Sequence, residues 1–145
     1  MGLDPGAKRI GVAVSDATRL VASPLATIVR ARFIADAGAI GAHYDERACV
    51  GLVIGLPLNM DGSSGPSAQA ARAFARNLLA VRDQPVLLWD ERLSTAAVTR
   101  AMIADDQSRA RRAEHVDKLA AAYVLQGVLD RLRAAGGPPG PDQRS

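Results

Sequence analysis

The chain has 145 residues, of which 48% are hydrophobic and 23% are charged, a balance that fits one compact domain and excludes an intrinsically disordered chain. Aromatic residues make up only 3%, which argues against proteins that bind single strands on aromatic platforms. The formal net charge of +3 permits nucleic-acid binding, and the single cysteine, Cys49, excludes a disulfide framework and a cysteine-rich zinc site.

Strand signals dominate the first part of the chain. Ile10, Val12 and Val14 alternate with small or polar residues, and this period of two predicts a strand. A polar turn at residues 16–19 and the segment LVASPLATIV then predict a hairpin, in which Pro24 indicates an irregular or edge position. The Ala-rich residues 33–48 are predicted to be helical.

The middle of the chain alternates between strand and helix signals. Residues 49–55, CVGLVIG, are typical of a strand covered on both faces, in which Cys49 is a small buried side chain. After a loop rich in Gly and Pro, Ser64 and Pro66 predict a helix start. Its expected apolar stripe consists of Ala70, Phe74, Leu78 and Val81.

Residues 85–89, PVLLW, predict another short buried strand, and Ser94 is a candidate cap for a helix over 94–104. A charged segment, 104–115, then precedes the last helix. The apolar face expected for that helix consists of Ala121, Val124, Leu125, Val128, Leu129 and Leu132. Hairpin strands followed by alternating helix and strand predict a mixed sheet with helices on its faces.

Outside these elements the sequence carries few other signals. The opening residues lack the apolar stretch of a signal peptide, and no apolar run is long enough to cross a bilayer, so we expect a cytoplasmic protein. We expect one domain over residues 1–133 and a disordered Gly/Pro-rich tail over 134–145.

Three carboxylates stand at informative places. Asp4 lies just before the first hairpin, Glu91 follows the buried run PVLLW, and Asp117 is expected in the first turn of the last helix, where the helix dipole favours its ionised form. Clustered carboxylates suit Mg²⁺ or Mn²⁺, and two such ions about 4 Å apart can support phosphodiester cleavage. The alternative is that these acids cap helices or face solvent. Asp90 should face away from Glu91 along an extended chain.

Basic residues near these acids are candidate phosphate ligands. Lys8 and Arg9 could contact a phosphate or form a solvated turn. The cluster of Arg109, Arg111 and Arg112 could bind phosphate or be an exposed charged loop. The loop at residues 55–65 is either a contact to nucleic acid or a long connection from strand to helix.

Four segments together resemble the YqgF/RuvX family of pre-16S rRNA nucleases and Holliday-junction-resolvase-like proteins. They are GLDPGAKRIGVAVSD, IGLPLNMDGSSGPSAQ, DERLST and VDKLAAAYVLQGVLD, and they occur in the family's order. The resemblance implies an RNase H-like α/β fold with a mixed five-stranded sheet that opens with antiparallel hairpin strands. It also implies a catalytic, metal-binding triad of Asp4, Glu91 and Asp117.

The sequence departs from the family pattern in three places. Only residues 1–3 precede Asp4, whereas the family has a longer first strand, so a clipped strand would weaken pairing beside the site. Ser64 and Ser67 stand where the family often has an acidic and a basic residue. The basic stretch before the last helix varies within the family.

The resemblance implies a metal-dependent nuclease that processes the end of pre-16S rRNA or cleaves branched DNA. Cleavage of a junction would favour a homodimer, because two symmetric cuts are needed, whereas a processing nuclease could act as a monomer. Two alternatives remain: a non-catalytic nucleic-acid-binding adaptor in transcription or ribosome assembly, and a fragment of a sugar-kinase or actin-like ATPase, for which the chain is too short.

Overall fold

The computed structural model describes residues 1–93 and 109–136, except for the side chains of residues 109–115. The helix expected over 94–104, with its cap Ser94, and residues 137–145 of the expected tail therefore lie outside the described residues. Within the described part, no helix has the length and apolar character that spanning a membrane would require.

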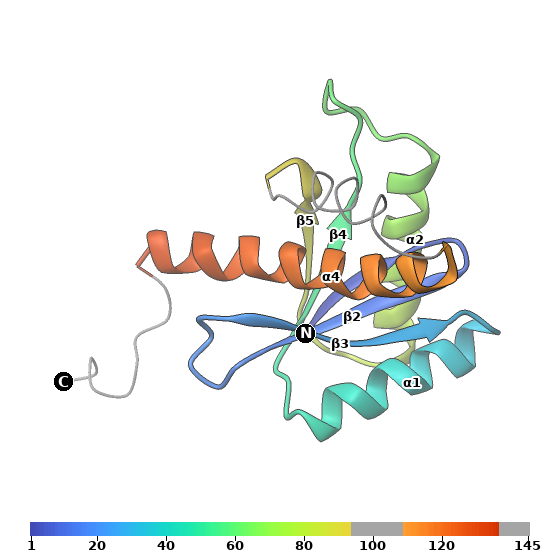
Figure 1. The fold of residues 1–145 in the computed structure, drawn as a ribbon, viewed down its shortest axis with the longest axis horizontal. Helices are drawn as coiled ribbons and strands as arrows, with labels where there is room; N and C mark the ends of the chain where they lie inside the picture. The colour runs from blue at the N-terminus through green and yellow to red at the C-terminus, as the bar shows by residue number, and fades with distance from the viewer. Residues whose placement is uncertain (94–108, 137–145) are drawn as a thin grey trace.

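A mixed sheet of five strands forms the centre of the described structure, as expected (Figure 1). The spatial order is β3-β2-β1-β4-β5, in which β1 pairs antiparallel with β2 and parallel with β4. The strands are β1 (Gly2–Pro5), β2 (Arg9–Ser15), β3 (Ala22–Val29), β4 (Leu52–Leu56) and β5 (Val86–Asp90). The short strand β1 thus occupies the middle of the sheet, where both of its edges are paired.

The hairpin of β2 and β3 confirms the expectation from the period of two. At its turn, the Asp16 carboxylate accepts hydrogen bonds from the backbone N–H groups of Leu20 and Val21, at 2.8 and 3.1 Å. Pro24 lies in an edge strand, as predicted, and the register shifts between Val12 and Ala13 opposite this part of β3. A proline is tolerated there because an edge strand has one row of backbone groups without a ladder partner.

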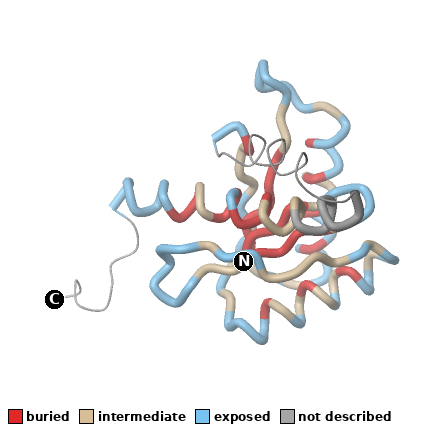
Figure 2. Tube along the Cα trace, viewed as in Figure 1, coloured by how far each residue is buried: buried red, intermediate tan, exposed pale blue. Residues whose placement is uncertain are grey.

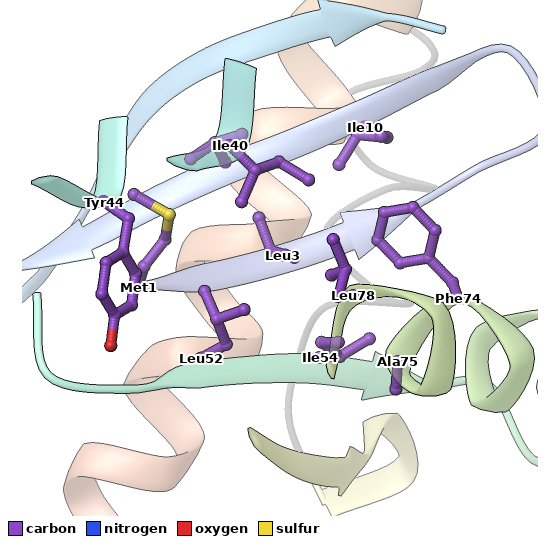
Figure 3. Close-up of a cluster of buried hydrophobic side chains, with 11 residues drawn as sticks. Met1, Leu3, Ile10, Ile40, Tyr44, Leu52, Ile54, Phe74, Ala75 and Leu78 are labelled. Carbon is purple, nitrogen blue, oxygen red and sulfur yellow. The ribbon is translucent and has the colours of Figure 1, made fainter. Parts of the chain in front are cut away.

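Helices cover both faces of the sheet (Figures 1 and 2). Helices α1 (Phe33–Glu46) and α2 (Pro66–Val81) pack on one face, and α4 (Arg109–Ala134) packs on the other. The larger apolar core lies beneath α1 and α2 (Figure 3). It includes Met1, Leu3, Ile10, Val12, Ile40, Tyr44, Leu52, Ile54, Phe74, Ala75 and Leu78.

Two strand predictions need correction. The strand expected from Cys49 begins only at Leu52, and Val50 is 67% exposed, because the residues before Leu52 form the loop out of α1. Cys49 is half-buried against the main core. The strand β5 lies at the edge of the sheet and is half-buried, with Leu87 47% exposed, so its apolar run does not indicate cover on both faces.

The start and the stripe of α2 also differ from expectation. Gly65 is the N-cap and provides no side-chain cap, so Ser64 lies one residue outside the helix. Ala70 and Val81 are exposed. The buried face consists of Ala68, Ala71, Phe74, Ala75 and Leu78, because small alanines let the helix lie close to the sheet.

The last helix, α4, begins at Arg109 rather than after the charged segment. Its expected apolar face is confirmed from Ala121 to Leu129, where all five predicted residues are buried, whereas Leu132 is 44% exposed. The first turns of α4 therefore carry the charged residues that the sequence placed in a loop.

Candidate active site

Asp4 lies on the central strand β1 and faces α4. Asp4 is only 9% exposed, and the neighbouring Leu3 points into the core on the opposite face of the sheet. Asp4 pairs with Gly11 of β2, and a Cβ at Gly11 would lie 1.9 Å from the backbone oxygen of Asp117. The helix α4 therefore crosses the sheet directly over the residue that pairs with Asp4.

Glu91 reaches the same face from the other side of β1. It begins a single 3-10 turn, η1 (Glu91–Leu93), directly after β5, and is 6% exposed. A Cβ at Gly55 of β4 would lie 2.7 Å from Oε1 of Glu91 and 3.2 Å from Cγ2 of Val124 on α4. Since Leu3 pairs with Ile54, Asp4 and Gly55 are the next residues along neighbouring parallel strands. The structure thus places Asp4 on β1 and Glu91 against the adjacent strand β4, both on the face beneath α4.

Asp117 lies on α4 beside this face, but not in the first turn of the helix. It follows Arg109 by about two turns, so the expectation that the helix dipole favours its ionised form is wrong, since that effect fades within the first turn. A guanidinium compensates the charge instead. Nε of Arg9 donates a hydrogen bond to Oδ2 of Asp117 at 3.0 Å, and both side chains are partly exposed.

The three acids do not form a preassembled cage. Among the side chains of residues 1–93 and 116–136, no group of three or more His, Cys, Asp and Glu is close enough to hold a metal ion. Asp4 and Glu91 share one face, whereas the carboxylate of Asp117 is held by Arg9.

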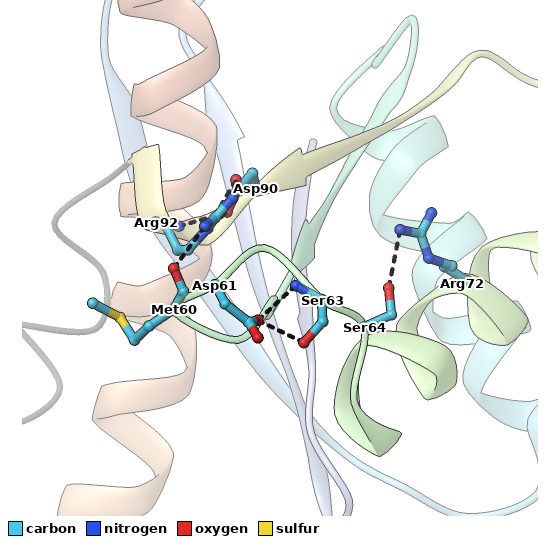
Figure 4. A network of polar contacts seen from close by, with 7 residues as sticks. All are labelled: Met60, Asp61, Ser63, Ser64, Arg72, Asp90 and Arg92. Carbon is cyan, nitrogen blue, oxygen red and sulfur yellow. Dashed lines mark hydrogen bonds and ion pairs between the residues drawn. The ribbon is translucent and has the colours of Figure 1, made fainter.

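Arg92 connects the end of β5 to the neighbouring loop, which the sequence did not predict (Figure 4). Its Nε and Nη2 donate hydrogen bonds to the Asp90 carboxylate at 2.7–3.1 Å, and its Nη1 donates to the backbone oxygen of Met60 at 3.1 Å. The hydrogen bond from Arg92 lowers the pKa of Asp90. Asp90 is thus engaged by Arg92, whereas the side chain of Glu91 lies against Gly55.

The loop between β4 and α2 is ordered by its own polar side chains. The Asp61 carboxylate accepts hydrogen bonds from the backbone N–H and the hydroxyl of Ser63, at 2.9 and 2.6 Å, which lowers the pKa of Asp61. Gly62 has a φ of +87°, and a Cβ there would lie 3.6 Å from the Arg92 guanidinium. The turn thus allows Arg92 to lie against the loop.

We expect Arg92→Ala to lower the cleavage rate about tenfold with little change in the free energy of unfolding, because a small displacement of η1 moves Glu91. The rate of single-turnover cleavage and a urea unfolding curve measure the two effects. Arg92→Lys is the matched control: it keeps the charge but loses the planar fork, so its rate should fall nearly as far. A wild-type rate in Arg92→Ala would show that the link to Met60 does not position Glu91.

The basic candidates have different surroundings. Lys8 is exposed in the turn between β1 and β2, and Arg9 is partly engaged by Asp117. Arg109, Arg111 and Arg112 belong to the first turns of α4, and their side chains lie outside the described part of the structure. Their contacts to nucleic acid stay predictions.

The fold is similar to that of RuvC from T. thermophilus. Its structure in complex with a Holliday junction substrate matches with a TM-score of 0.58 at 14% identity, covering 96% of this chain and 97% of that one. A second T. thermophilus RuvC structure matches with a TM-score of 0.50. At this identity the likeness shows the fold alone, which is the RNase H-like fold.

Sequence comparison gives the family. The model of RuvX, described as "Holliday junction resolvase", matches residues 1–131. A protein of Paracoccus denitrificans named "Putative pre-16S rRNA nuclease" is 60% identical over 93% of this chain and 85% of its own length. Proteins with the same name from Rhodospirillum rubrum and Rhodopseudomonas palustris are 60% and 58% identical, over 91% and 92% of this chain and 83% and 84% of their own lengths. The chain therefore belongs to the RuvX family of nucleases.

Proposed function

We propose that this nuclease depends on a divalent cation held by Asp4, Glu91 and Asp117. The observation that carries the proposal is that two buried acids share one face of the sheet: Asp4 lies on β1, and Glu91 lies against Gly55 of the adjacent strand β4. Two acids on one buried face provide the anionic oxygens that a divalent cation binds.

The donor set fits Mg²⁺ or Mn²⁺, because both prefer carboxylate oxygens. Glycine at positions 11 and 55 lets the backbone of α4 at Asp117 and the side chain of Glu91 lie close to the sheet, which brings these acids to the face that carries Asp4. Asp117 fits as the third ligand if its carboxylate exchanges the Arg9 guanidinium for the cation. Bound at these acids, one or two ions would activate a water for attack on phosphorus and neutralise the leaving oxygen.

The chain's own residues position the substrate. Asp4 lies on the central strand β1 and Glu91 in the turn directly after β5, so their carboxylates need little rearrangement. Arg9, once Asp117 turns from it, would be free to donate to a phosphate oxygen, and Lys8 stands exposed on the same turn. Arg109, Arg111 and Arg112 would extend this contact along the backbone of the nucleic acid.

The substrate is structured nucleic acid. The relatives' name supports the end of a pre-16S rRNA, and the family description supports a Holliday junction. We propose that the protein acts in the cytoplasm, as a monomer on RNA or as a two-fold homodimer on a junction.

The test incubates the full chain with labelled fragments of pre-16S rRNA and with a four-way DNA junction, each with Mg²⁺, Mn²⁺ or EDTA. We expect cleavage with either metal and none in EDTA, and the preferred substrate assigns the role. Cleavage that persists in EDTA would disprove the metal dependence. Binding of either substrate without cleavage under any condition would favour a non-catalytic adaptor.

A further inference from the structure

A pocket between η1 and the second half of α4 is lined by none of the three acids of the candidate active site. It has a volume of about 550 Å³ and is lined by Trp89, Leu93, Gly127 and Arg131. Leu93 is 66% exposed and Arg131 is exposed, so the pocket opens to solvent. It combines one large aromatic ring, an aliphatic side chain and a cation.

The indole ring of Trp89 lines this pocket. Its indole N–H is buried and has no hydrogen-bond partner within the described part of the chain. A Cβ at Gly127 would lie 3.0 Å from this nitrogen, so the absence of a side chain on α4 is what admits the indole. A buried N–H without an acceptor is energetically unfavourable. Hydrogen bonding therefore does not account for a tryptophan at this position. The ring contributes apolar and π surface, part of which faces the pocket.

The guanidinium of Arg131, which lines the same pocket as the ring, is available to bind a ligand. Arg131 lies one turn beyond Gly127 on the same side of α4, and its guanidinium makes no hydrogen bond or ion pair with the residues that the structure describes. The neighbouring acid, Asp130, is engaged by Gln126 and Arg133 at 2.9 and 2.7 Å. A negatively charged group could therefore approach Arg131 with limited competition.

The pocket stands on the same elements as the candidate active site. Trp89 precedes Glu91 by two residues at the end of β5, and Gly127 follows Asp117 by ten residues, or about 15 Å along α4. The chain has only five aromatic residues: Phe33, Phe74 and Tyr44 pack in the core under α1 and α2, whereas Trp89 is on the α4 side. Tyr123, 37% exposed, lies one turn before Gly127 on the same helix.

We propose that this pocket binds a nucleotide of the substrate strand a few nucleotides away from the cleaved bond, with its base against Trp89 and its phosphate on Arg131. The chemistry is that of single-strand binding, in which a base stacks on an aromatic ring and a guanidinium contacts the backbone. The inference rests on the proposed function, because it assumes that the strand passes Glu91. It predicts that the enzyme needs an unpaired nucleotide beside its cleavage site.

The test uses the fluorescence of Trp89, which is the only tryptophan of the chain. The full chain is titrated in EDTA with a short single-stranded oligonucleotide and with the same oligonucleotide made of abasic units. We expect saturable quenching by the first and little by the second, because only a base can stack on the indole. Arg131→Gln should weaken binding about fivefold. It should also reduce the slope of the logarithm of the binding constant against the logarithm of the salt concentration by about one, as expected for the loss of one phosphate contact. Arg76→Gln, an equal loss of charge on an exposed part of α2, is the matched control and should bind as wild type.

A second measurement, binding by variants of Trp89, tests the role of the ring itself. With a labelled oligonucleotide, Trp89→Leu should weaken binding about fivefold or more, and Trp89→Phe should retain most of it, because phenylalanine keeps a stacking face. Circular dichroism checks that both variants fold. No saturable quenching, or equal affinity in Arg131→Gln and Arg76→Gln, overturns the inference.

The two hypotheses fail separately. Metal-dependent cleavage without quenching of Trp89 would retain the proposed nuclease function and refute the pocket. Quenching that depends on Arg131, in a protein that never cleaves, would retain the pocket as a nucleotide site and refute the metal-dependent nuclease.

Discussion

Asp4→Asn should abolish cleavage while leaving the fold intact. The amide keeps the size of the side chain but removes the negative charge from the centre of the site, so we expect the rate to fall by at least about 10²–10³-fold. The free energy of unfolding should stay close to the wild-type value in the absence of metal, because the amide occupies the same volume as the carboxylate at this buried position. Single-turnover cleavage with Mn²⁺ and a urea titration in EDTA measure the two effects.

The matched control is Asp83→Asn, which makes the same change in the exposed connection between α2 and β5. It should cleave at nearly the wild-type rate. Calorimetric titration with Mn²⁺ adds a readout that does not depend on turnover, and Asp4→Asn should weaken binding of the ion where Asp83→Asn does not. An Asp4→Asn variant that still cleaves within a factor of about three of wild type would remove Asp4 from the catalytic set.

Gly11→Ala should have the largest effect on stability. Its added Cβ would lie 1.9 Å from the backbone oxygen and 2.3 Å from the backbone carbon of Asp117. Neither atom can turn away as a flexible side chain can, so α4 must move off the sheet and expose the apolar face from Ala121 onward. We expect a loss at or above the upper end of the about 1–3 kcal/mol typical of overpacking, measured by urea unfolding.

Gly38→Ala makes the same change where a Cβ meets nothing within 4 Å. Because Gly38 lies within α1, alanine should stabilise the protein by about 0.5–1 kcal/mol. The two substitutions therefore have opposite expected signs. Equal stability of Gly11→Ala and wild type would mean that α4 does not cross the sheet at Asp117.

The amino-acid pattern was sufficient to predict the class of fold and to select Asp4 and Glu91 as candidates. The period of two in β2, the apolar run of β4 and the helical stripe of α4 each depend on local burial, which side-chain pattern records directly. Asp4 could be selected because it lies just before the hairpin signal, and Glu91 because it follows the apolar run of β5. Strand β1 carried almost no pattern of its own, since it has only four residues.

The contacts between these residues depend on packing that the pattern does not record. The pair of Arg9 and Asp117 joins positions 108 residues apart, and no local pattern indicates it. The glycines at 11 and 55 matter because α4 and Glu91 lie over them, which depends on the order of the strands. The start of α4 was misplaced because charged residues form helix as readily as loop when the next turns bury an apolar face. Local patterns specify which side of an element is buried, whereas the partners across that surface are set by packing between elements distant in sequence.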